Sequence, residues 1–365
     1  MNGKGRAIYF LLLLAAAISM VFGPAPEAAA QTKPVQLVYA SGYVKTHVQV
    51  GVLAEEWMKK IEQATQGRVK MRGVYGGTLL AAPDILDGLM KQTADAGSIV
   101  IGFTPGKLPL SSSLSATIDL NLGNKLDMRG IAALNNKLSE EFPEFMGEYQ
   151  NLGVTPLLWV PTMPYAVIST KPIKSIADFY GKKIRTFGTY LPKLFEAAGA
   201  VPMAVSFGEI YTGLQTGVVD GAVTDPPAMG PAKFYEVAKY LTLTGPGWGA
   251  ACALSPVAYL VNNKSFAQLS KADQDIVKKV SREMTLYGAD LMTKTGSEAV
   301  ADLEKRGVTV IRLPQGEVDK WAGKCPDWYA LAAKDLDAKG LPGTKLMARY
   351  QELAKEYISG KWKPW

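Results

Sequence analysis

The sequence has few of the residues on which most enzymes and metal sites depend. Among its 365 residues there are one histidine, His47, and two cysteines, Cys252 and Cys325. It contains no Cys/His cluster spaced for zinc, no Gly-x-Ser-x-Gly turn for a serine nucleophile and no glycine-rich phosphate loop. A lone histidine near a helix start is more often a capping or surface residue than a catalyst. These absences argue against an enzyme, a metal site and a cofactor, although they leave open whether a metal ion bridges a ligand and whether the cysteines pair.

Long apolar runs are also rare, and the one that occurs is at the N-terminus. Two basic residues precede the apolar run Ala7–Gly23, and Ala28-Ala29-Ala30 matches a small-residue cleavage site. We expect residues 1–30 to be a signal peptide that is cleaved near Ala30, which leaves a soluble protein in the periplasm. The alternative, an uncleaved membrane anchor, is disfavoured because the apolar core is short for a span. No later stretch is apolar for long enough to cross a bilayer.

The charge of the chain is basic but scattered. The formal net charge is +7, and the lysines do not form the clusters that nucleic-acid binding requires. We therefore expect no nucleic-acid partner and favour an anionic ligand. A length of 365 residues allows two domains with sizeable cores.

The most informative stretch runs from Tyr180 to Gly245 and predicts a β-α-β-α-β unit. Pro192 fits the first turn of one helix, Gly199 fits its end, and Ser206-x-x-Glu209 is a capping box that opens the next. The predicted strands are Lys182–Thr186, Val201–Val205 and Val218–Val223. Strands that alternate with helices indicate a parallel sheet.

Polar residues stand at the carboxyl ends of these strands. They are Arg185-Thr186, Ser206 and Thr224-Asp225. Ligands of parallel sheets bind outside the carboxyl ends of the strands, and helix N-termini in that position suit an anion. We therefore interpret this stretch as half of a ligand-binding cleft, with Arg185 as its charged anchor.

The first half of the chain predicts a second unit of the same kind. Its strands are Pro34–Ala40, which alternates like an edge strand, Arg68–Tyr75 and Ala94–Ile101, and its helices are Val50–Ala64 and Pro83–Lys91. Later elements are crossing strands at Leu157–Val160 and Tyr165–Ser169, a strand at Val257–Val261, a long helix over Ala272–Leu303, a strand at Val308–Leu313, and a helix over Gly316–Leu336 with a kink at Pro326. Two such units predict an α/β protein of two lobes. We place lobe I at residues 31–157 plus about 245–285, and lobe II at residues 158–244 plus about 286–365.

Several motifs together resemble the DctP-type substrate-binding subunits of tripartite ATP-independent periplasmic (TRAP) transporters. They are Gly181–Arg185, the Tyr-x-x-Leu-Gln-x-Gly-Val-Val-Asp-Gly run within Glu209–Gly221, Lys233–Thr244, Gln66-Gly67-Arg68-Val69 and Gly77-x-Leu79. The resemblance implies a type II-like periplasmic binding protein fold, with parallel-based sheets flanked by helices. It further implies two lobes, joined by crossing strands and a long helix, that close over a small organic acid. The partners it implies are the small and large membrane subunits of a TRAP permease, which take up the ligand with an ion gradient. The protein would be a monomer, or else a dimer.

The resemblance also assigns candidate binding residues. Arg185 stands where the family arginine grips the ligand carboxylate; the alternative is a surface salt bridge to Asp178 or Glu209. Four other expected cleft positions carry residues that differ from the sialic-acid-binding pattern: Tyr165 for an arginine, Thr224 for an asparagine, Val100 for an acidic residue and Tyr43 for an asparagine. Such a cleft favours a monocarboxylate with an apolar or aromatic body, because the polar groups of a sugar or dicarboxylate would go unpaired.

Two further residues have more than one interpretation. Trp248 is either a wall of the cleft or part of the packing between the lobes. Asp225 could pair with a ligand hydroxyl, pair with Arg185 or cap a turn. The main hypothesis is an extracytoplasmic receptor that delivers a carboxylate to a TRAP permease. The alternatives are the ligand-binding module of a sensory system and, less favoured, an exported carboxylate-processing enzyme.

Overall fold

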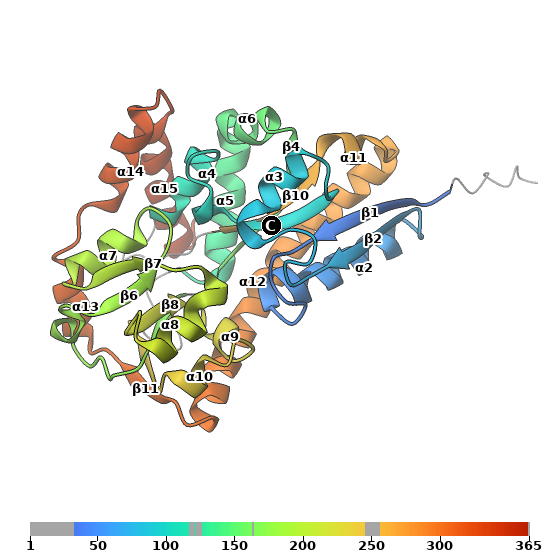
Figure 1. Cartoon of the computed structure of the whole chain (residues 1–365). Helices are drawn as coiled ribbons and strands as arrows, with labels where there is room; N and C mark the ends of the chain where they lie inside the picture. The colour runs from blue at the N-terminus through green and yellow to red at the C-terminus, as the bar shows by residue number, and fades with distance from the viewer. Residues whose placement is uncertain (1–32, 117–119, 121–125, 163, 245–255, 364–365) are drawn as a thin grey trace, which may run out of the picture. The chain divides into compact units, whose positions relative to one another are not determined.

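The computed structural model describes residues 33–116, 120, 126–162, 164–244 and 256–363, and the structural statements below concern these residues (Figure 1). The chain divides into two compact units, Met1–Pro34 and Val35–Trp365. Everything that follows lies in the second unit. Within the described residues, no helix combines the length and the apolar character needed to cross a membrane.

The first sheet has five strands in the order β2-β1-β3-β10-β4. The strands are β1 (Val35–Ala40), β2 (Val69–Val74), β3 (Ala96–Val100), β4 (Val154–Pro161) and β10 (Pro256–Asn262). β1 pairs in parallel with both β2 and β3, whereas β10 runs antiparallel between β3 and β4. The predicted edge position of the first strand is wrong, because β1 lies between two neighbours. Alternation shows only that one face is more buried than the other, and an interior strand can have the same pattern.

The second sheet has six strands in the order β11-β9-β5-β8-β6-β7. The strands are β5 (Ala166–Ser169), β6 (Lys183–Thr186), β7 (Val201–Ala204), β8 (Gly221–Thr224), β9 (Tyr240–Leu243) and β11 (Thr309–Arg312). β6 pairs in parallel with β7 and β8, as predicted, and β5 runs antiparallel between β8 and β9. Both sheets are therefore mixed. β4 and β5 belong to different sheets, so the chain passes from one sheet to the other after Pro161 and before Ala166, as the sequence predicted.

Helices flank both sheets. Their bounds are α2 (Leu53–Ala64), α3 (Ile85–Met90), α4 (Pro109–Ser113), α5 (Met128–Glu141), α6 (Pro143–Asn151), α7 (Leu191–Ala197), α8 (Ile210–Thr216), α9 (Pro226–Met229), α10 (Phe234–Val237), α11 (Asn263–Ala267), α12 (Lys271–Lys305), α13 (Gln315–Ala322), α14 (Trp328–Asp337) and α15 (Gly343–Ile358). The predicted signals at Gly199 and Ser206-x-x-Glu209 are present: Gly199 has φ 87°, and Ser206 and Glu209 form a capping box. The helix predicted over Gly316–Leu336 is two helices rather than one kinked helix. The break contains Pro326, which lacks an N–H, and the carboxylate of Asp327 accepts from the first N–H groups of α14.

The 35-residue helix α12 connects three hydrophobic cores. Its first turns place Val277 and Met284 in the core of the five-stranded sheet, where the indole of Trp57 also donates to Ser281 at 2.9 Å. Farther along, Met292 joins a core with α5, α14 and α15, and Val300 joins the core of the six-stranded sheet. α12 therefore fixes both sheets through one continuous element (Figure 1).

A short π-helical turn, η1 (Val48–Val52), carries the chain from the loop after β1 into α2. The N–H groups of Gly51 and Val52 both donate to the carbonyl of His47, at 2.8 and 3.0 Å. A Cβ on Gly51 would meet the backbone carbonyl of Lys45 well inside contact distance. The loop therefore folds back onto the turn at a residue without a side chain.

Gly51→Ala should lower the free energy of unfolding by about 1–3 kcal/mol, because backbone rather than a flexible side chain must move. Urea denaturation measures the change. The matched control is Gly316→Ala in α13, where an added Cβ would meet no atom within 4 Å. The control should be neutral or gain up to about 1 kcal/mol from helix propensity. Equal effects of the two substitutions would contradict the close approach at Gly51.

Candidate ligand-binding site

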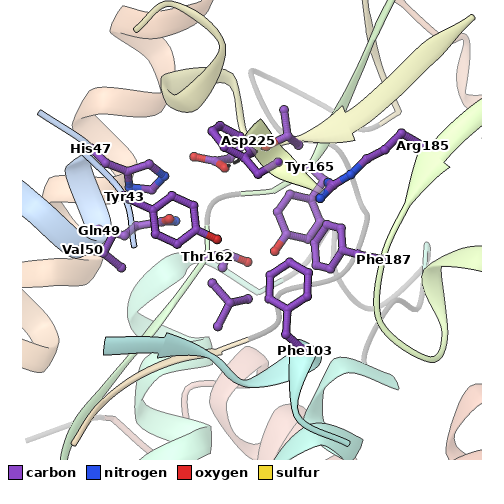
Figure 2. A pocket seen from close by; sticks show the side chains of 13 residues that line it. Tyr43, His47, Gln49, Val50, Phe103, Thr162, Tyr165, Arg185, Phe187 and Asp225 are labelled. Atoms are coloured by element: carbon purple, nitrogen blue, oxygen red, sulfur yellow. Dashed lines mark hydrogen bonds between the residues drawn. The ribbon is translucent and has the colours of Figure 1, made fainter. Parts of the chain in front are cut away.

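A cavity lies between residues supplied by both sheets (Figure 2). Its volume is about 30 Å³, counted as the space open to the centre of a water molecule. It is lined by Tyr43, His47, Gln49, Val50, Val100, Phe103, Thr162, Tyr165, Arg185, Phe187, Phe207, Thr224 and Asp225. Because a single water needs about 10–15 Å³ on this measure, the cavity has room for only a few waters. A larger occupant requires its walls to move apart.

Arg185 is the cation of this cavity. It lies on β6, between Met203 of β7 and Ala222 of β8, and only 2% of its surface is exposed. Its Nε donates to the carbonyl of Val205 at 2.8 Å, and its Nη1 donates to the carbonyl of Val223 at 3.1 Å. Val205 directly follows β7, and Val223 lies within β8, so both carbonyls belong to the two strands that flank β6. The strands that pair with the backbone of β6 therefore also hold the side chain of Arg185.

No carboxylate in the described part of the chain forms an ion pair with Arg185. The alternative of a surface salt bridge is wrong, because Asp178 accepts from the backbone of Lys174 and Ser175, and Glu209 caps Ser206. Burial lowers the pKa of Arg185, and the nearby phenols of Tyr43 and Tyr165 oppose this effect. The guanidinium is thus removed from water and held by neutral carbonyls. An anion that enters the cavity would meet a positive charge with donors to spare.

Phenylalanine and tyrosine rings make up a large part of the remaining wall. The guanidinium of Arg185 lies 4.9 Å from the ring centre of Phe187. Phe187 in turn contacts Phe103 and Tyr165, with ring centres 4.9 and 5.3 Å apart. Tyr43 packs against Phe207 at 5.7 Å. Burial raises the pKa of Tyr43 to about 12 and raises that of Tyr165 further, so both phenols are neutral hydrogen-bonding groups at physiological pH.

A second polar group of side chains lines the cavity around His47. The imidazole, 8% exposed, lies 4.8 Å from the ring of Tyr43, and its Nδ1 has no hydrogen-bond partner among the described residues. Gln49, 2% exposed, has an unpartnered Nε2 by the same criterion. Asp225 is 6% exposed, and its Oδ1 accepts from the Thr224 hydroxyl at 3.3 Å. Burial raises the pKa of Asp225 and lowers that of His47, and each of the two opposes the shift of the other.

The structure brings six of the seven predicted site residues to this one cavity. These are Tyr43, Val100, Tyr165, Arg185, Thr224 and Asp225. Trp248 lies outside the described residues, as does Cys252, so neither the wall at Trp248 nor a pairing of Cys252 with Cys325 is tested. Asp225 stands at the N-cap position of α9 and forms no ion pair with Arg185. Ser206, the third predicted strand-end residue, does not line the cavity, because its hydroxyl caps the next helix with Glu209.

Several lining residues were missed by the sequence analysis. His47 was expected to be a capping or surface residue, and this is wrong: it is buried in the cavity wall, and its side chain forms no capping hydrogen bond. The missed residues also include Gln49, Phe103, Thr162, Phe187 and Phe207. Phe187 could have been found, because it follows the end of the same strand as Arg185. Nothing in the sequence marks Gln49, whose place depends on the π-helical turn.

The described residues contain no group of three or more His, Cys, Asp or Glu side chains that could hold a metal ion. The arrangement also lacks a nucleophile activated by a base. A buried cation, aromatic walls and a cavity shared by two mixed α/β sheets define a solute-binding protein.

Comparisons with known proteins agree with this class. The sequence model of the bacterial extracellular solute-binding proteins, family 7 (DctP), matches residues 40–335, and the chain belongs to this family. It is 27% identical over 263 residues to a solute-binding protein of Verminephrobacter eiseniae, which covers 72% of this chain and 75% of the relative. The resemblance to TRAP substrate-binding subunits is thereby confirmed. Members of the family are receptors of transporters rather than enzymes, and they act outside the cytoplasm.

Solved structures share the fold. A TRAP periplasmic solute-binding protein from Bordetella bronchiseptica with bound (R)- and (S)-mandelate has a TM-score of 0.77 at 23% identity, over 89% of this chain and all of that one (100%). The ectoine-binding protein of the TeaABC TRAP transporter from Halomonas elongata has a TM-score of 0.75 at 23% identity, over 88% of this chain and 99% of that one. These likenesses confirm the two-lobed α/β binding-protein fold. The boundaries of the two lobes stay a prediction.

His47 is the single histidine of the chain, so its titration can be followed directly by NMR. Because burial lowers its pKa, we expect a midpoint below the ordinary value of 6.5. Folding then favours the neutral imidazole: this contribution to stability is full above pH 6.5 and is lost as the pH falls toward the folded-state pKa. In Asp225→Asn the midpoint should fall further, since the nearby carboxylate favours the charged ring. A midpoint at or above 6.5, or a rise in the variant, would contradict this arrangement.

Proposed function

We propose that this protein is an extracytoplasmic receptor that binds a small organic monocarboxylate with an apolar or aromatic body and delivers it to a TRAP permease. The observation that carries the proposal is Arg185: a buried guanidinium in a cavity wall without a carboxylate partner among the described residues. A ligand carboxylate can accept two parallel hydrogen bonds from such a group. The other candidate binding residues are Tyr43, Val100, Tyr165, Thr224, Asp225 and Trp248.

The walls support a ligand with one carboxylate rather than two. Arg185 is the only arginine or lysine among the described lining residues, so a second carboxylate would be buried without a cation. The rings of Phe103, Phe187 and Phe207 offer apolar contact to the rest of the ligand. Relatives do not decide the ligand, because one binds mandelate and another binds ectoine. The residues that line the cavity of this chain must therefore determine which ligand binds.

Binding would be coupled to closure. The cavity takes Tyr43 and Val100 from the side of the five-stranded sheet and Arg185 and Thr224 from the six-stranded sheet. A ligand that contacts both sets binds most tightly when the two sheets approach, and so shifts an open population toward a closed one. Because a cavity of about 30 Å³ is too small for such a ligand, the ligand-bound closed form must be more open than the form seen here. The membrane subunits of the permease would recognise the closed form.

Arg185→Ala should weaken carboxylate binding by about 2–5 kcal/mol, the effect of removing one partner of a buried charge pair. Isothermal titration against aromatic, branched and keto monocarboxylates, dicarboxylates and a sialic acid measures it. Arg185→Lys should restore only part of the affinity, because it keeps the charge without the planar fork. Since Arg185 also holds two backbone carbonyls, affinity rather than melting temperature is the proper readout.

The matched control is Arg68→Ala, which removes an arginine that pairs with Asp273 away from the cavity. The carboxylate affinity of this variant should stay within twofold of that of the unmodified protein. Tight binding only of sugars or dicarboxylates would contradict the proposal that the ligand is a monocarboxylate. Unchanged affinity in Arg185→Ala would contradict the proposal that Arg185 binds the ligand carboxylate.

If residues 1–30 are a signal peptide, they predict where the mature chain begins. When the full chain is expressed in a bacterium with a periplasm, the protein recovered from that compartment should begin near Gln31, after cleavage at Ala30. Intact mass spectrometry gives the N-terminus directly. Replacing Ala28 and Ala30 by bulky charged residues should leave the precursor uncut. A protein that retains its first 30 residues and stays in the membrane fraction would instead support the alternative of an uncleaved membrane anchor.

A further inference from the structure

The end of the cavity away from Arg185 is polar, and three side chains make it so. His47, Gln49 and Asp225 are 8%, 2% and 6% exposed, and each lines the cavity. His47 Nδ1 and Gln49 Nε2 have no hydrogen-bond partner among the described residues. A buried polar atom left unpaired costs about 1–3 kcal/mol. Thr162 Oγ1, in the same cavity wall, is unpartnered as well within the described part of the chain, and the two atoms at His47 and Gln49 indicate that a polar group of the ligand belongs beside them.

This group of side chains is separate from the anchor for the carboxylate. The phenols of Tyr43 and Tyr165 interact electrostatically with both Arg185 and Asp225, and Asp225 also interacts with His47. In Figure 2 the rings of Tyr43 and Tyr165 lie between Arg185 on one side and His47 and Gln49 on the other. The cavity therefore has two polar ends with aromatic walls between them.

A hydroxyl is the group that fits the second end. The carboxylate of Asp225 accepts, the amide of Gln49 donates through Nε2, and the imidazole of His47 does either. A hydroxyl has one donor, which suits the carboxylate of Asp225, and two acceptor lone pairs, which suit Gln49 Nε2 and a protonated His47 Nδ1. A carbonyl would place an acceptor against Asp225. An ammonium would compete with His47 for that carboxylate and would face the donors of Gln49.

We propose that the ligand is a hydroxylated monocarboxylate whose hydroxyl is remote from its carboxylate. The carboxylate binds Arg185, the hydroxyl binds between His47, Gln49 and Asp225, and the apolar body crosses between the rings of Tyr43 and Tyr165. This inference rests on the proposed function, because it takes the carboxylate to lie at Arg185. It adds a second determinant of specificity at the opposite end.

The test compares acids that differ by that one hydroxyl. The pairs are 4-hydroxybutanoate with butanoate, and 4-hydroxyphenylacetate with phenylacetate, each titrated calorimetrically into the full mature chain. For the pair whose length matches the cavity, the hydroxy acid should bind about 5- to 150-fold more tightly, since its loss leaves a buried polar group unpaired. Arg185→Ala should weaken both members of that pair alike.

Two variants locate the hydroxyl. Gln49→Met and His47→Phe keep the approximate size of each side chain and remove its hydrogen bonding. Each should reduce the preference for the hydroxy acid over the plain acid at least severalfold, and this ratio rather than either affinity alone is the readout. The matched control, Gln63→Met on the exposed face of α2, should keep the full preference. Two independent substitutions keep the test valid if one of them prevents folding.

Equal binding of both members of each pair would overturn the inference and leave the proposed function intact, provided that binding still requires Arg185. An undiminished preference in both Gln49→Met and His47→Phe would also overturn it. Tighter binding of 4-aminobutanoate than of 4-hydroxybutanoate would replace the hydroxyl by a cationic group. Tighter binding of mandelate than of 4-hydroxyphenylacetate would place the hydroxyl beside Arg185. Failure of every carboxylate to bind would overturn the proposed function together with this inference.

Discussion

The site depends on a positive charge that the protein holds away from water without neutralising it. Arg185 lies 2% exposed on an interior strand, and two backbone carbonyls accept from it. Carbonyl dipoles orient the guanidinium and offset part of its desolvation, but they do not replace a counter-ion. The surrounding rings lower the local polarity, so a carboxylate that reaches Arg185 interacts more strongly than it would at the surface. The other walls of the cavity then decide which carboxylate gains this interaction.

The geometry of those walls is set by two different kinds of structure. On the six-stranded sheet, Arg185 and Thr224 stand at the ends of regular strands, where pairing with neighbours fixes their directions. On the other side, His47 and Gln49 come from a loop and a π-helical turn whose close packing depends on Gly51. One side of the cavity is thus built by sheet register and the other by an irregular turn. Specificity can change on the irregular side without disturbing the anchor.

This difference also explains how far the sequence predicted the site. Arg185, Thr224 and Asp225 were found because strand ends and family motifs mark them. Gln49 was missed because the π-helical turn, whose hydrogen bonds span one residue more than those of an α-helix, alters which side chains face inward. His47 was misinterpreted because burial depends on the other half of the chain, which local patterns do not contain. The helices α5, α6 and α15 were not predicted either, and Pro326 marks a break between two helices rather than a kink.

The strand order has a consequence for the time course of folding. In the five-stranded sheet β10 lies between β3 and β4, and it is made from residues 256–262, about a hundred residues after β4. The six-stranded sheet is likewise complete only when β11, at residues 309–312, has been made. The helix α12 must also be complete before it can join the three cores. Neither sheet can therefore close while the first two thirds of the chain are being synthesised. Such late closure keeps both sheets incomplete until the last third of the chain has been made, a property that suits a protein whose family acts outside the cytoplasm.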